Sequence, residues 1–112
     1  MRYVVLIYED EALWRAADDA ERARYEAAHR AFTDAARDAG VTVVAGEALA
    51  GVASARTVRH AEDTTVTDGP FAETTEQLTG LYLVDAPDEA TLLDLVRLLP
   101  ETTLEVRECV QP

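Results

Sequence analysis

Hydrophobic residues recur along the chain with two different spacings, and these spacings separate strands from helices. Arg2–Tyr8 is an unbroken β-branched and aromatic run, which predicts a central strand or a strand covered on both faces. Asp18 and Glu21 have the spacing of a capping box, and Gly40 ends the helical pattern that follows. The pattern predicts a long amphipathic helix, whose inner face consists of Tyr25, Ala28, Phe32, Ala35, Ala36 and Ala39.

The rest of the chain predicts a small strand pair and a second strand–helix–strand unit. The second helix opens at Pro87-Asp88-Glu89 and ends at Pro100. Its apolar stripe comprises Leu92, Leu95, Val96 and Leu99. The predicted strands are Val41–Leu49, Arg56–His60, Thr64–Thr67, Gly80–Asp85 and Thr103–Val110.

This order of elements predicts an α+β protein with the ferredoxin-like, split βαβ arrangement, in which both helices cover one face of an antiparallel sheet. The other face needs a covering, and strands this apolar favour a second subunit. We therefore expect a homodimer that packs sheet to sheet.

The length and the charge of the chain predict how many domains it has and which partners it does not bind. The 112 residues suit one domain, residues 1–112, and 22 acidic against 10 basic residues give a formal net charge of −12. Such a surface repels phosphate backbones, so we expect no nucleic-acid binding. The chain has one cysteine, Cys109, which cannot form a disulfide within the chain, and its N-terminal apolar run is short and is followed by acidic residues. We therefore expect a cytoplasmic protein without a membrane span.

His29 lies at the edge of the apolar stripe of the first predicted helix. A neighbouring carboxylate could tune it into a general acid or base, since the unperturbed pKa of histidine is about 6.5. The alternative is a partly buried structural histidine that makes one hydrogen bond.

Asp68 ends a predicted strand, and Gly69 and Pro70 allow an abrupt change of direction after it. This turn could hold the carboxylate for chemistry, or Asp68 could merely bind backbone N–H groups within the turn.

Other residues are candidates for binding a ligand. Phe71 could line a pocket or fill the core, and Tyr82 is a candidate from the strand that follows. Arg56 could bind an anionic group of a substrate or form a surface ion pair, and the same holds for Arg59 and Arg107. We expect His60, beside an acidic turn, to be exposed. The sequence has no metal-ligand cluster of familiar spacing, phosphate loop or dinucleotide fingerprint, so no cofactor is expected.

Several segments together resemble the YCII-related proteins, most closely their DGPF subgroup. They are RYVVLIYEDE, the H-x-x-F of His29–Phe32, DAG, VTDGPFAETTEQLTGLYLVDAPDEA and LEVRECV. The resemblance spans nearly the whole chain and implies a dimeric α/β barrel of ferredoxin-like protomers. It also implies an active-site pair of His29 and Asp68. Where the subgroup commonly has lysine, this chain has Thr75.

The resemblance supplies no substrate, although one YCII relative is a dehydrochlorinase of a hydroxylated aromatic. One hypothesis is a cofactor-independent lyase or isomerase in which His29 moves a proton and Asp68 orients it. The alternative is a ligand-binding or regulatory module, because proteins resembling this subgroup are often encoded beside extracytoplasmic-function sigma factors. The sequence does not identify the small-molecule ligand of either.

Overall fold

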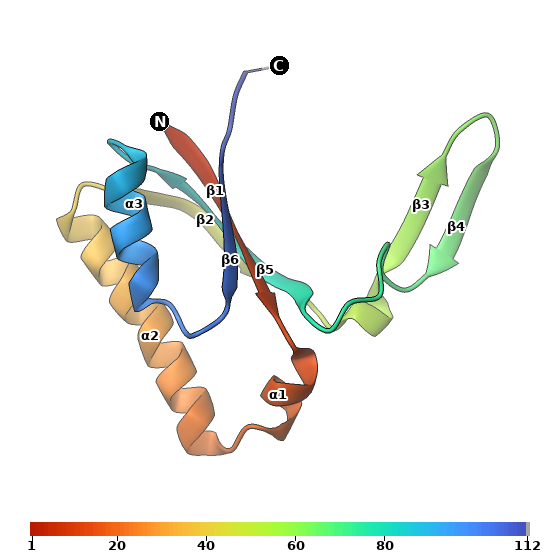
Figure 1. Cartoon of the computed structure of the whole chain (residues 1–112), viewed down its shortest axis with the longest axis horizontal. Coiled ribbons are helices and arrows are strands. Elements are labelled where there is room, and N and C mark those ends of the chain that lie inside the picture. The colour runs from red at the N-terminus through yellow and green to blue at the C-terminus, as the bar shows by residue number, and fades with distance from the viewer. Residues whose placement is uncertain (112) are drawn as a thin grey trace.

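The computed structural model of the chain describes residues 1–111, which form one four-stranded sheet, a separate two-stranded hairpin and three α-helices (Figure 1). The sheet strands are β1 (Arg2–Glu9), β2 (Thr42–Ala48), β5 (Gln77–Asp85) and β6 (Thr103–Glu108). The hairpin consists of β3 (Arg56–His60) and β4 (Thr64–Asp68). The helices are α1 (Glu11–Ala16), α2 (Asp19–Asp38) and α3 (Glu89–Leu95), with short 3-10 turns at η1 (Val52–Ser54) and η2 (Val96–Leu98).

The sheet has the strand order β2-β5-β1-β6, and every neighbouring pair is antiparallel. Val5 of β1 is paired with Tyr82 of β5 and with Val106 of β6, which sets these side chains on the same face. This is the strand order of a ferredoxin-like fold, consistent with the α+β arrangement that the sequence predicts.

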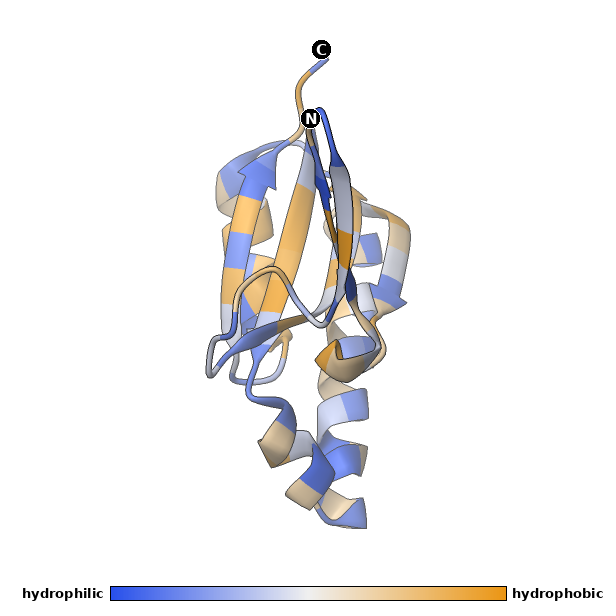
Figure 2. Cartoon of the chain, turned by 90° about the vertical axis from the view of Figure 1, so that its right-hand side faces the viewer, coloured by the Kyte–Doolittle hydropathy of each residue, from blue (hydrophilic) through white to orange (hydrophobic). Residues whose placement is uncertain are grey.

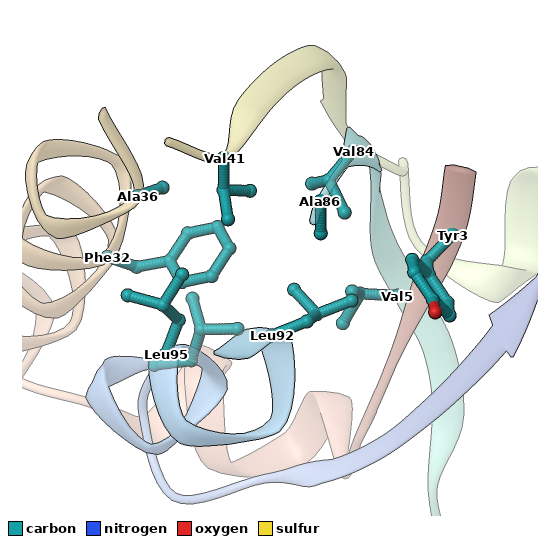
Figure 3. Close-up of a cluster of buried hydrophobic side chains, with 10 residues drawn as sticks. Tyr3, Val5, Phe32, Ala36, Val41, Val84, Ala86, Leu92 and Leu95 are labelled. Carbon is teal, nitrogen blue, oxygen red and sulfur yellow. The ribbon is translucent and has the colours of Figure 1, made fainter. Parts of the chain in front are cut away.

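The hydrophobic core lies between this face of the sheet and the helices α2 and α3. Phe32 on α2, Leu92 on α3, and Val5 and Val84 on the two central strands are all fully buried (Figure 3). Ala36 is also buried, and its small side chain fits the close packing that the alanine-rich face of α2 predicts. The core therefore fixes the position of α2 over the sheet.

No helix formed by residues 1–111 covers the opposite face of the sheet (Figures 1 and 2). Strand alternation places Val4 and Leu6 of β1 there, paired with Leu83 and Leu81 of β5. All four side chains are half-buried by their neighbours. The β3–β4 hairpin projects from this side, away from α2 and α3 (Figure 1).

The structure departs from the sequence prediction in two places that matter for the site. Helix α1 was not predicted, although Asp10 caps it by accepting a hydrogen bond from the Ala12 amide. Strand β5 begins at Gln77, three residues before the predicted start at Gly80, because pairing with β1 continues past a register shift between Ile7 and Tyr8. The extension places Thr79 within the sheet.

Candidate functional site

His29 and Tyr82 come together where α2 crosses β5. The Nδ1 atom of His29 lies 2.6 Å from the hydroxyl oxygen of Tyr82, and both side chains are half-buried. The Nε2 atom of His29 is buried and has no hydrogen-bond partner among the described residues. The Tyr82 hydroxyl is therefore the polar group that holds the imidazole.

The spacing of residues on α2 explains why His29 faces the sheet. Asp18 accepts a hydrogen bond from the Glu21 amide in a complete capping box, which fixes the start of the helix. Tyr25, His29 and Phe32 then fall on one face at intervals of four and three residues. The Tyr25 and His29 rings are 4.7 Å apart, and the Phe32 ring is 4.9 Å from that of Tyr82.

A glycine on the neighbouring strand makes room for Tyr82. A Cβ atom at Gly46 of β2 would lie 2.8 Å from both Cδ1 and Cε1 of the Tyr82 ring. Real carbon atoms do not approach so closely, so the ring occupies space that any other residue at 46 would fill.

A carboxylate that the sequence analysis overlooked lies beside this pair. Oε2 of Glu9, the last residue of β1, accepts hydrogen bonds from the Tyr25 hydroxyl at 2.8 Å and from Thr79 Oγ1 at 2.5 Å. The spacing of Tyr25 one turn before His29 was a signal for part of this network. Glu9 and Thr79 gave none, because their proximity depends on strand register.

Burial dominates the electrostatics of the site. It lowers the pKa of His29 below its usual value, and the negative charge of Glu9 opposes that shift. Burial also raises the pKa of Tyr82. Burial, followed by the hydrogen bond to Glu9, raises the pKa of Tyr25 strongly. At neutral pH the site therefore contains a neutral imidazole and two protonated phenols beside a carboxylate.

His29, Tyr25 and Tyr82 line a cavity of about 250 Å³ between α2 and the β2–β5 edge of the sheet. Its walls combine the His29 imidazole and the hydroxyls of Tyr25, Tyr82 and Thr79 with apolar surface. The remaining lining residues are Ile7, Gly46, Glu47, Ala48, Gly80 and Leu81. A small organic molecule with one or two polar groups suits this lining.

Asp68 lies elsewhere, at the end of β4 in the projecting hairpin (Figure 1). Its side chain is 87% exposed, and its Oδ1 is 3.2 Å from Nε of Arg56 on β3. Gly69 follows with a φ of 97°, so the turn chemistry expected of this segment is present. Within one chain the structure does not bring Asp68 to His29, and their pairing stays a prediction for an assembly of two chains.

Pro70, Phe71, Arg59 and His60 also belong to the hairpin and its base, whereas Arg107 lies on β6. Pro70 and Phe71 line a separate cavity of about 640 Å³ there, and Phe71 is 75% exposed. The Arg59 guanidinium lies 5.4 Å from the centre of the Phe71 ring. His60 is exposed, as expected, and bonds to Thr64 through Nδ1. Of the predicted residues, His29 and Tyr82 therefore meet in the cavity beneath α2, whereas Asp68, Arg56, Pro70 and Phe71 gather at the hairpin.

The described residues lack two further features, a metal-ligand cluster and a membrane-spanning helix. Residues 1–111 contain no group of three or more histidine, cysteine, aspartate or glutamate side chains placed to hold a metal ion. No helix within the same range is both long and apolar enough to cross a membrane.

Comparison with known proteins establishes the family. The family model for the YCII-related domain matches residues 1–111. The chain belongs to the YCII-related family. It is also 38% identical, over 102 residues, to an uncharacterized protein of Rhizobium meliloti (strain 1021), covering 87% of this chain and 78% of that protein. This YCII-related chain thus has an uncharacterized relative that spans most of both sequences.

Proposed function

We propose that this YCII-related protein is a cofactor-independent enzyme that isomerises, or eliminates a group from, a small polar or aromatic compound by proton transfer. The observation that carries the proposal is the 2.6 Å contact between the Tyr82 hydroxyl and Nδ1 of His29 in the wall of the cavity. A neutral imidazole accepts a proton at this position without first losing one.

The geometry favours a relay through Tyr82. Because Nε2 of His29 is buried, the substrate transfers its proton to the Tyr82 oxygen while the Tyr82 hydroxyl proton passes to Nδ1 of His29. The resulting imidazolium is stabilised by the charge of Glu9, which lies close enough to act on the pKa of His29. Return of the proton to another atom completes an isomerisation, and loss of a leaving group completes an elimination.

The test uses a panel of probe compounds, namely carbonyl compounds with acidic C–H groups and chlorinated hydroxyaromatics. Proton NMR in D2O measures exchange of the C–H group, and chloride release measures elimination. We expect His29→Gln and Tyr82→Phe to slow turnover by about 10²- to 10⁴-fold, the usual contribution of general acid–base catalysis. His60→Gln on the hairpin is the matched control and should leave the rate unchanged. Turnover that survives both site variants would refute the relay.

We also propose that the chain falls within the DGPF subgroup and forms a homodimer. The string Asp68–Phe71 at the exit from β4 supports the first proposal. The uncovered sheet face, with Val4, Leu6, Leu81 and Leu83 on it, supports the second. Light scattering at micromolar concentration should give twice the chain mass of 12.2 kDa.

A further inference from the structure

A second cavity, of about 360 Å³, adjoins the His29 cavity and shares Tyr25 with it. It lies between the end of β1, the helix α1, the start of α2 and the segment that follows η2. Three aromatic side chains, Tyr8, Trp14 and Tyr25, contribute to its wall. The Trp14 and Tyr25 rings pack at 5.0 Å with a tilt of 53°.

The charged side chains that line this second cavity are all acidic. Its lining includes five carboxylate residues and no arginine or histidine. Several of these carboxylates already serve the fold: Asp10 and Glu21 accept hydrogen bonds at helix starts, and Glu76 accepts one from Thr103. The charge remains when such bonds form, because hydroxyl and amide donors do not neutralise a carboxylate.

Glu9 is the carboxylate best prepared to receive a ligand. Tyr25 and Thr79 both donate to its Oε2 atom, which fixes the side chain, whereas Oε1 receives no hydrogen bond from the described residues. Glu9 also forms no ion pair with a basic side chain in residues 1–111. It is a positioned anion with one open acceptor beside two aromatic rings.

The aromatic wall suits a cation as well. The Arg22 guanidinium already lies 4.9 Å from the centre of the Trp14 ring, although Arg22 does not line the cavity. A ring of this kind attracts a cation through its negatively charged face, and tryptophan does so best. A carboxylate and aromatic faces together recognise an ammonium group, whereas a carboxylate or phosphate ligand would meet uncompensated negative charge.

We propose that the cavity bounded by Glu9, Trp14 and Tyr25 binds a small organic cation, an ammonium or substituted ammonium compound. The positive group lies against the open side of Glu9 and the aromatic rings, and its apolar part follows Leu13 and Ala17. This binding requires no proton transfer and does not rest on the catalytic proposal for His29.

Trp14 provides the assay, because it is the single tryptophan of the chain and lines the cavity. Its fluorescence is titrated in the full-length protein with choline and, separately, with 3,3-dimethyl-1-butanol, which has the same shape without the charge. We expect choline to cause a saturable change and to bind at least about tenfold more tightly than the alcohol. Added salt should weaken choline binding.

Three variants locate the effect. Glu9→Gln keeps an acceptor for Tyr25 and removes the charge, and Glu101→Gln removes a charge from an exposed residue of the same wall. Each should weaken choline binding, Glu9→Gln by about tenfold. Glu26→Gln, on the exposed side of α2, removes one negative charge in the same way and should have no effect on choline binding.

Several results would overturn the proposal. Equal binding of choline and the alcohol would make the cavity an apolar groove without preference for charge. The absence of a saturable fluorescence change would remove the site. Selectivity for choline that persists in both Glu9→Gln and Glu101→Gln would place the cation elsewhere. Far-ultraviolet circular dichroism checks that each variant folds. If Glu9→Gln does not fold, the choline affinity of Glu101→Gln decides whether the cation binds in this cavity.

Discussion

Replacing Gly46 by alanine tests whether strand β2 makes the site by leaving space for Tyr82. The new Cβ atom would lie 2.8 Å from two ring carbons of Tyr82, whereas carbon atoms pack best at about 3.5–4.0 Å. The ring cannot simply swing away, because Phe32 packs against it and His29 is bonded to its hydroxyl. Either the ring or the strand must therefore move by roughly 1 Å.

The expected cost follows from these contacts. Overpacking of this kind lowers the free energy of unfolding by about 1–3 kcal/mol, and a lost hydrogen bond to His29 would add about 1 kcal/mol. The loss of glycine flexibility in the unfolded chain offsets about 0.4–1 kcal/mol. We expect Gly46→Ala to lower the free energy of unfolding by about 1–3 kcal/mol in urea denaturation, and to shift the NMR signals of the His29 imidazole.

Two controls separate this mechanism from a general effect of removing glycine. At Gly51, which has a φ of −55°, an added Cβ meets no atom closer than 3.5 Å, so Gly51→Ala should be neutral or slightly stabilising. In a Tyr82→Ala background the cost of Gly46→Ala should disappear, since the clashing ring is gone. Wild-type stability of Gly46→Ala, with unchanged His29 signals, would refute the reasoning.

The remaining predictions concern the histidine, the core and the second chain. Burial depresses the pKa of His29, so the unfolded state binds more protons, and the free energy of unfolding should fall as the pH drops below about 6.5. Urea denaturation at several pH values measures this fall. The part of the fall that His29 causes should be absent from His29→Gln and present in His60→Gln. Phe32→Ala, at a fully buried position, should lower the free energy of unfolding by about 3–5 kcal/mol in urea denaturation. Leu83→Glu on the open face should halve the mass found by light scattering if the proposed dimer forms. Asp68→Asn should lower the pKa of His29, followed by NMR, only where that dimer is present.

The sequence predicted the fold well wherever local patterns decide it. The capping box at Asp18 and the apolar spacing of α2 are local, and so is the β-branched run of β1. The predicted start of β5 was wrong by three residues. The true start depends on pairing with β1 across a register shift, and the hydrophobic periodicity of the sequence does not reveal such a shift. Helix α1 has six residues and no buried side chain, too little apolar pattern for prediction.

The site was predicted in part, and the reason lies in the distance between its members along the chain. His29 and Tyr82 were both named, but nothing local shows that residues 53 positions apart share a hydrogen bond. Glu9 was overlooked because an acid at a strand end is common, and its role depends on Tyr25 and Thr79 lying beside it. Glu9, Tyr25 and Thr79 form a network only through tertiary contacts, which depend on the order of the strands.

The position of the hairpin changes what a role for Asp68 requires. Within one chain the carboxylate that acts on the pKa of His29 is Glu9, and Asp68 is paired with Arg56 on a hairpin that projects from the uncovered side of the sheet. A second chain that covers this face would lie on the side toward which the hairpin extends. Asp68 can therefore reach a histidine site only in an assembly, so its catalytic role requires the homodimer, whereas the homodimer does not require that role. Glu9 needs no partner, which makes it the acid to mutate first.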